Sequence, residues 1–279
     1  MIGIIGGSGL YNIDGINIIE EVEVSTPFGK PSDNYIVAEY SGKTVVFLPR
    51  HGRGHKFPPH MINFRANIWG FRKLGINKVI SISAVGGINK DLKPGDFVIS
   101  DNFVDFTKSR VQTFYEGIHS KTADTQFKDE VEEYLNGKRV VHIDITEPFC
   151  PVVRYTLIKA CKENSSSFVD RGVYVATEGP RLESASEIRI FSNLGFDVVG
   201  MTLVPEVVLA RELRMHFGSI SIVTNLAAGI SESRLTSDEV VQMMHIKNEE
   251  IKQVILKALE KLPEKFSCQC EEVLKGAAI

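Results

Sequence analysis

The chain has 279 residues, of which 43% are hydrophobic and 24% are charged, with a formal net charge of −3. This charge argues against generic binding to nucleic acid or to a membrane surface, and no stretch is apolar for long enough to cross a bilayer. No linker-like segment interrupts the chain, and its first residues lack the pattern expected of a signal peptide, so we expect one domain over residues 1–279 and a cytoplasmic enzyme or binding protein.

The first apolar run, residues 2–5, predicts a short buried strand. It ends in Gly6-Gly-Ser-Gly9, where glycines permit a sharp turn and leave backbone N–H groups able to face an anion. The pattern is not GxGxxG, and no acidic residue follows at the distance of a ribose contact. A dinucleotide site is therefore disfavoured.

A β-hairpin is predicted next, with strands at residues 35–40 and 44–48. Its second strand runs into a glycine-rich loop that carries Arg50, His51 and Arg53. Arginine suits bidentate phosphate binding, and glycines let the backbone approach a ligand closely. We therefore expect an anion site here rather than a solvated basic loop.

The middle of the chain alternates between helices and strands. A helix is expected over 61–74 and a buried parallel strand over 78–83, and this strand opens into the small-residue loop Ala84-Val-Gly-Gly87. Another strand is expected at 96–100 and a helix at 155–162, whereas residues 105–136 are polar and irregular and give no assignment.

Two strands, at residues 172–176 and 197–201, each end in a polar loop that leads into a helix. Ser184 and Glu187 have the spacing of a capping box, so one helix starts there, and a second is expected over 207–215. A further buried strand ends at Asn225, and Thr236 with Glu239 precedes a long amphipathic helix over 240–262.

These elements predict an α/β fold with a central sheet flanked by helices, and the hairpin makes that sheet mixed. In open α/β sheets the loops at the carboxyl ends of strands form the ligand crevice. The chemistry is therefore expected in the loops that follow these strands.

The sequence gives little support for a metal site. The four cysteines, Cys150, Cys161, Cys268 and Cys270, contain no CxxC pair, which makes zinc unexpected. The arginines beside His51, His55 and His60 would repel a cation. Cys268-Gln-Cys270 is either two exposed thiols in a C-terminal tail or a disulfide of the kind found in hyperthermophiles, with the disulfide slightly favoured.

Taken in order, five blocks of the chain resemble the trimeric nucleoside phosphorylases, which include purine nucleoside phosphorylase and methylthioadenosine phosphorylase. The blocks are Gly6-Gly-Ser-Gly9, Arg50-His51-Gly-Arg-Gly-His55, Ser83-Ala84-Val-Gly86, Glu178-Gly-Pro-Arg181, and Gly200-Met-Thr202 with Val204-Pro-Glu206. The resemblance covers about the whole chain. It implies reversible phosphorolysis of an N-glycosidic bond, with inorganic phosphate as co-substrate and no metal or organic cofactor.

The resemblance also implies roles for individual residues. Phosphate would be held by Ser8, Arg50, His51, Ser83, Ala84 and Thr202. Met201 would lie against the sugar, and Glu183 and Asn225 would contact the base. Leu182, Leu226 and Ala227 would also bind substrate. Glu183 and Asn225 would be the catalytic residues.

The identity of the base depends on two departures from the methylthioadenosine enzymes. Those enzymes carry Asp where this chain has Asn225, and Phe-Ser where it has Leu182-Glu183. An ionised carboxylate only accepts hydrogen bonds, so Glu183 suits the N1–H of a 6-oxopurine and opposes the N1 lone pair of adenine. Asn225 can donate to O6 and accept from a protonated N7. The alternatives are that Glu183 is an exposed carboxylate at a helix start and Asn225 a plain turn residue.

Two further expectations concern the 5′ end of the sugar and the assembly. Ser237 stands where purine nucleoside phosphorylases place a His and methylthio enzymes an apolar residue, so 5′-methylthioinosine stays an open option. His142 matches a position that the family lends to a neighbouring subunit, which implies a homotrimer or a hexamer of paired trimers. The competing functions are a methylthioadenosine phosphorylase that tolerates Glu183, and a non-catalytic sensor of purine or phosphate.

Overall fold

The computed structural model describes residues 1–7, 16–117, 127–230 and 236–278. Its strands are β1 (Ile2–Gly6), β2 (Asn17–Val22), β3 (Tyr35–Tyr40), β4 (Lys43–Pro49), β5 (Lys78–Gly87), β6 (Phe97–Val98), β7 (Asn102–Phe106), β8 (Phe168–Val169), β9 (Val173–Thr177), β10 (Val198–Gly200) and β11 (His216–Leu226). Its α-helices are α1 (Phe64–Lys73), α2 (Lys128–Leu135), α3 (Pro151–Glu163), α4 (Ala185–Asn193), α5 (Leu203–Glu212) and α6 (Ser237–Lys261). Two short 3₁₀ helices are η1 (Pro59–Met61) and η4 (Cys270–Glu272).

These strands form one sheet, and β5 lies at its centre. The main order is β2-β3-β4-β1-β5-β10-β9-β7, and β11 also pairs with β5 and continues through β6 to β8. β5 is parallel to β1 and β11 but antiparallel to β10. The predicted α/β class with a mixed central sheet is confirmed, and the expected hairpin is β3–β4. Two further antiparallel pairs, β10 with β5 and β6 with β11, also make the sheet mixed, and the sequence did not indicate them.

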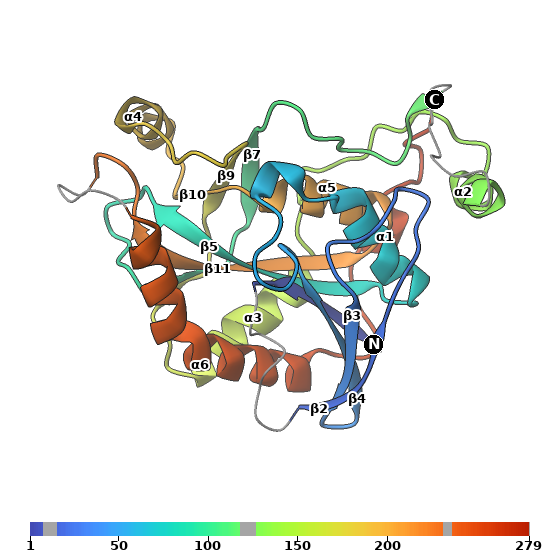
Figure 1. The fold of residues 1–279 in the computed structure, drawn as a ribbon, viewed down its shortest axis with the longest axis horizontal. Coiled ribbons are helices and arrows are strands. Elements are labelled where there is room, and N and C mark those ends of the chain that lie inside the picture. The colour runs from blue at the N-terminus through green and yellow to red at the C-terminus, as the bar shows by residue number, and fades with distance from the viewer. Residues whose placement is uncertain (8–15, 118–126, 231–235, 279) are drawn as a thin grey trace.

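Helices cover both faces of this sheet (Figure 1): α1 and α5 lie on one side, and α3 and α6 on the other. The alternation of side chains in β5 separates the two larger hydrophobic cores, one on each face of the sheet. Val79 and Val85 pack on the α1 and α5 side, whereas Ile80 and Ile82 pack on the α3 and α6 side. Ser81 and Ser83 alternate with these isoleucines along β5, so their side chains lie on the same face as the two valines and their hydroxyls face α5. This face of β5 supplies the polar groups described below.

Several element bounds differ from the sequence prediction. The helix expected over 61–74 starts only at Phe64, where Asn63 caps it by accepting a hydrogen bond from the Ala66 N–H. The strand expected at 96–100 is only Phe97–Val98. The segment without an assignment, 105–136, contains the end of β7 and, among its described residues, α2. The capping box at Ser184 and Glu187 is present as predicted. No helix of the described residues is long and apolar enough to span a bilayer.

Candidate active site

The carboxyl-terminal half of β5 positions the candidate site. Gly86 of β5 is opposite Asn225 of β11 on one side and Val199 of β10 on the other. The β11 ladder shifts register between Val223 and Asn225, so Thr224 is left out of the pairing while Asn225 stays opposite Gly86. Ser83 lies three residues before Gly86, which is about 10 Å along a strand. β5 therefore separates two polar groups, one at Ser83 and one at Asn225.

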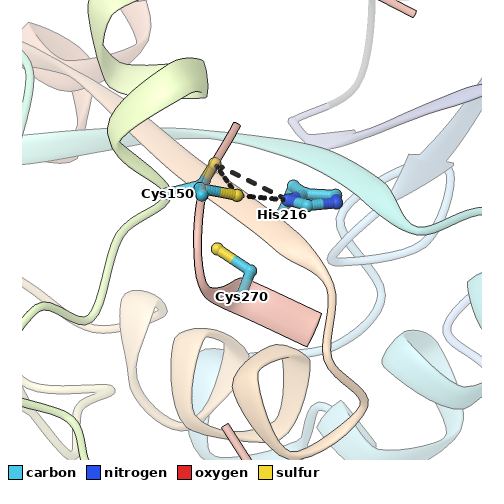
Figure 2. Close-up of side chains that lie close together, drawn as sticks. Cys150, His216 and Cys270 are labelled. Carbon is cyan, nitrogen blue, oxygen red and sulfur yellow. Dashed lines mark hydrogen bonds between the residues drawn. The ribbon is translucent and has the colours of Figure 1, made fainter. Parts of the chain in front are cut away.

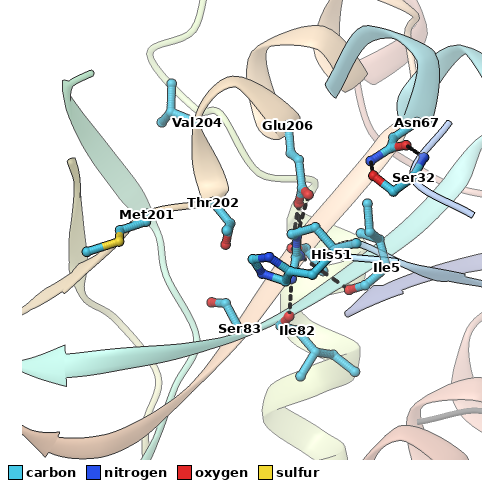
Figure 3. A network of polar contacts seen from close by, with 12 residues as sticks. Ile5, Ser32, His51, Asn67, Ile82, Ser83, Met201, Thr202, Val204 and Glu206 are labelled. Carbon is cyan, nitrogen blue, oxygen red and sulfur yellow. Dashed lines mark hydrogen bonds and ion pairs between the residues drawn. The ribbon is translucent and has the colours of Figure 1, made fainter. Parts of the chain in front are cut away.

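The first group, around Ser83, is brought together by the antiparallel pairing of β10. Because β10 runs back along β5, its end delivers Thr202 toward Ser83 rather than beyond the end of the sheet. Both side chains are largely buried, with exposed fractions of 6% for Ser83 and 7% for Thr202. In Figure 3 their hydroxyls and the ring of His51 turn toward the same region. Ala84 follows Ser83 on β5 and is partly exposed.

Thr202 occupies the N-cap position of α5, yet its side chain does not cap the helix. Val204 has non-helical backbone angles and Pro205 has no N–H, so the regular part of α5 begins after the Thr202 turn. Ser83 Oγ lies 3.0 Å from Ser221 Oγ of β11, so a second hydroxyl supports it from the neighbouring strand. The region between Ser83 and Thr202 therefore has hydroxyl donors and no carboxylate among these groups.

Arg50 lies beneath this region in a buried ion pair. Its Nε donates to Glu206 Oε1 at 2.5 Å and its Nη2 to Glu206 Oε2 at 3.0 Å. Nη2 also donates to Ser81 Oγ and Nη1 to the Ile82 carbonyl. The bidentate edge of the guanidinium thus already faces Glu206, and both side chains are almost fully buried. Direct bidentate capture of phosphate by Arg50 would require this pair to open, so its predicted phosphate contact stays a prediction.

His51 follows Arg50 and has a fixed tautomer. Its Nδ1 lies 2.8 Å from the Phe57 carbonyl oxygen, which can only accept, so Nδ1 carries the proton. Burial, together with the charge of Arg50, lowers the pKa of His51 to about 4. The imidazole is therefore neutral near pH 7 and offers Nε2 as an acceptor. His55 stacks on it with ring centroids 4.2 Å apart.

The second polar group contains Asn225 and Glu183. Asn225 Nδ2 donates to the Leu226 carbonyl at 2.9 Å, and its Oδ1 accepts from the Thr224 hydroxyl at 2.9 Å. Because a carbonyl cannot donate, the Leu226 contact fixes which way the amide points. Each polar atom of Asn225 keeps the capacity for one more hydrogen bond. The amide can therefore present one donor and one acceptor to a ligand.

Glu183 lies just before α4 and is only partly exposed, unlike the free carboxylate considered as an alternative. Its Oε1 accepts from the Thr177 hydroxyl at 2.5 Å, which ties it to the end of β9. Burial raises the pKa of Glu183, and the Thr177 hydrogen bond opposes that shift. The loop after β11 approaches the same helix start, because Gly229 packs against Ala185. Asn225 and Glu183 thus belong to loops that meet at one end of the sheet.

Arg110 joins these loops and was not predicted. Its guanidinium donates to four backbone carbonyls, those of Thr177, Glu178, Met201 and Val204. It thereby links the loop after β9 to the loop after β10. No motif marks Arg110, which lies in the segment 105–136 that the sequence left without an assignment.

The other predicted residues are placed as follows. Met201 precedes Thr202, and its sulfur lies close to Gly179 in the loop after β9. Ala227 is buried and packs with residues of α4, Leu226 is partly exposed, and Leu182 is 47% exposed. His142 is exposed, and its N–H donates to the Ala277 carbonyl near the C-terminus. Ser8 and the side chain of Ser237 lie outside the described residues.

Comparison with known proteins gives matches to phosphorylases over nearly the whole chain. The family model described as "Phosphorylase superfamily" matches residues 1–260. A "probable 6-oxopurine nucleoside phosphorylase" of Thermococcus kodakarensis is 48% identical over 276 residues, covering 99% of this chain and 98% of the relative. A "probable S-methyl-5′-thioinosine phosphorylase" of Methanothermobacter thermautotrophicus is 43% identical, covering 100% of this chain and 90% of the relative.

Solved structures agree with these matches. Methylthioadenosine phosphorylase from Schistosoma mansoni in complex with adenine superposes with a TM-score of 0.88 at 30% identity. The superposition covers 99% of this chain and 98% of that one. The chain belongs to the phosphorylase superfamily, as the five blocks of its sequence indicated.

The buried ion pair gives a direct stability prediction. Replacing Glu206 with Gln should lower the free energy of unfolding by about 3–5 kcal/mol, because it leaves a buried guanidinium without its counter-charge. Denaturant unfolding measures this change. Glu23→Gln is the matched control, since the Lys30–Glu23 pair is exposed and should contribute less than about 1 kcal/mol. Equal midpoints for Glu206→Gln and wild type would contradict this account of Arg50.

Proposed function

We propose that this protein catalyses the reversible phosphorolysis of 6-oxopurine nucleosides to free base and ribose or deoxyribose 1-phosphate. The observation that carries the proposal is the fixed amide of Asn225, whose remaining donor and acceptor match O6 and a protonated N7. The relative from Thermococcus kodakarensis bears the name of this activity. The reaction is a purine-salvage step that uses phosphate as co-substrate.

The two polar groups along β5 suit the two halves of this reaction. The Ser83 and Thr202 hydroxyls donate to ionised phosphate oxygens, and the neutral His51 accepts from a phosphate O–H. The C1′–N9 bond breaks with its electron pair moving to the purine, while a phosphate oxygen forms the new bond to C1′. The purine takes up a proton from solvent at N7, and Asn225 Oδ1 accepts a hydrogen bond from the resulting N7–H. Positioning and electrostatics account for the rate increase in such a site.

Adenine is disfavoured at two atoms. The ionised carboxylate of Glu183 accepts N1–H from hypoxanthine or guanine but repels the N1 lone pair of adenine. Asn225 cannot turn its amide over to suit a 6-amino group, because Oδ1 would then face the Leu226 carbonyl. Sites that leave such polar groups unpaired discriminate by roughly 10⁴-fold.

The non-catalytic alternative and the nature of the sugar are tested together. Incubation of inosine with phosphate should release hypoxanthine and ribose 1-phosphate in equal amounts, and omission of phosphate should stop the release. A sensor would bind inosine without turning it over, and this result would overturn the proposal. Comparing kcat/KM for inosine and 5′-methylthioinosine in the same assay determines the preference at the 5′ end of the sugar. The second substrate is included because the Methanothermobacter relative is named for it.

Asn225 supplies a specificity prediction. Asn225→Asp removes the donor to O6 and places a carboxylate against the Leu226 carbonyl, so the ratio of kcat/KM for inosine over adenosine should fall by at least about 100-fold. Asn164→Asp, at the end of α3, is a matched control that should leave the ratio unchanged. An unchanged ratio in Asn225→Asp would remove Asn225 from base recognition.

Glu183 supplies a pH prediction. Its carboxylate must be ionised to accept N1–H, and burial raises its pKa. As pH falls through that raised pKa, kcat/KM for inosine should decline about tenfold per pH unit, with a midpoint above that of an exposed Glu near 4.3. Glu183→Gln should be slower and should lack this acid limb, whereas the control Glu187→Gln should keep it. Retention of the limb in Glu183→Gln would assign it to another group.

Two expectations about assembly and location accompany the proposal. His142 is exposed on the segment that pairs with the C-terminal tail, which fits a residue that serves a neighbouring subunit of a trimer or hexamer. We place this activity in the cytoplasm, where purine nucleosides are salvaged.

A further inference from the structure

Three separate parts of the chain bring four soft ligands together away from the candidate active site. Cys150 immediately precedes α3, His216 is the first residue of β11, and Cys268 and Cys270 lie in the C-terminal segment around η4. The three sulfur atoms and one ring nitrogen all lie within 4.8 Å of one another. In Figure 2 the side chains of Cys150, His216 and Cys270 lie close together.

The distances between these atoms match the edges of a tetrahedral metal shell. Cys150 Sγ lies 3.8 Å from Cys268 Sγ and 3.7 Å from His216 Nδ1, and Cys268 Sγ lies 3.2 Å from the same nitrogen. Zinc bonds of about 2.3 Å to sulfur and about 2.0–2.1 Å to nitrogen give tetrahedral edges of about 3.8 Å and about 3.5 Å. A disulfide would need the sulfurs about 2.05 Å apart. All four cysteines of the chain are free thiols, so the structure does not contain the disulfide that the sequence slightly favoured.

The surroundings of the cluster also suit a structural metal site. Cys150, His216 and Cys270 are almost fully buried, so Cys270 is not the exposed tail thiol considered from the sequence. The Phe266 ring packs on His216 with centroids 4.2 Å apart. While Nδ1 of His216 faces the sulfurs, its Nε2 lies 3.7 Å from Glu271 Oε1. A carboxylate beyond a ligating histidine commonly orients the ring in metal sites.

We propose that Cys150, His216, Cys268 and Cys270 bind one Zn²⁺ ion as a closed structural site. Each thiol binds as a thiolate and releases its proton to solvent, and the imidazole binds through Nδ1, so the ligands and metal carry a net charge of −1. Four protein ligands leave no open position, which indicates a structural rather than a catalytic metal. Three thiolates favour a soft metal ion over Mg²⁺ or Ca²⁺.

The site would fasten the C-terminal tail to the body of the protein. Beyond the cluster, the tail pairs Ala278 with Val141, and Ala277 accepts from the N–H of His142. Zinc would therefore hold in place the strand-like segment that carries His142. The expectation against zinc rested on the absence of a CxxC pair, but two of these ligands lie far from the Cys268-Gln-Cys270 pair in the sequence.

Metal content tests the proposal. The full-length protein, expressed with zinc and purified without chelator, should contain about one zinc per chain by mass spectrometry. Cys268→Ser and Cys270→Ser should lower that content at least tenfold, whereas Cys161→Ser, a buried cysteine outside the cluster, should retain it. Zinc that persists in both ligand variants would be adventitious and would overturn the proposal.

A measurement on the wild-type protein avoids dependence on variants that fail to fold. Metal-free protein titrated with Co²⁺ should take up one equivalent and develop both thiolate charge-transfer absorption and the intense visible bands of tetrahedral cobalt. Its thermal midpoint should rise when zinc is added back. A protein that binds neither ion, or that contains a disulfide between any two of the three cysteines when purified under reducing conditions, would contradict the site.

Discussion

The buried ion pair between Arg50 and Glu206 is the interaction on which the candidate active site depends. It joins the end of β4 to the first turn of α5, and Ser81 and the Ile82 carbonyl of β5 complete its hydrogen bonds. A buried charge pair is tolerated only when its geometry and its remaining hydrogen bonds are satisfied, so these elements must pack in one arrangement. That arrangement places Thr202, His51 and Ser83 around one region.

The central strand β5 then sets the distance between the two halves of the chemistry. Ser83 belongs to the group proposed to hold phosphate, Gly86 lies beside Asn225, and about 10 Å of strand separates Ser83 from Gly86. The reversed direction of β10 returns Thr202 to Ser83, and Arg110 links the loop after β10 to the loop that leads to Glu183. The site is thus assembled from a mixed sheet, because a wholly parallel sheet would send the Thr202 loop beyond the end of β5.

Much of this could be predicted from the sequence, and the limits have physical causes. Strong apolar periodicity and the capping box at Ser184 located the main strands and helices, and ordered glycine-rich blocks identified the family. Strand direction at β10 could not be read, because hydrophobic patterns do not encode parallel or antiparallel pairing. The ion pair of Arg50 with Glu206 and the bonds of Arg110 to two loops could not be predicted either, because they join residues far apart in the sequence. The Cys150, His216, Cys268 and Cys270 cluster was missed because motif spacing detects only ligands that are close in sequence.

We propose that fixed hydrogen-bond polarity at Glu183 and Asn225 selects a 6-oxopurine. The most direct test is kcat/KM of the wild-type protein for inosine and for adenosine, measured side by side at saturating phosphate. The account predicts that inosine is preferred by roughly 10⁴-fold. Equal values for the two nucleosides, or a preference for adenosine, would contradict it.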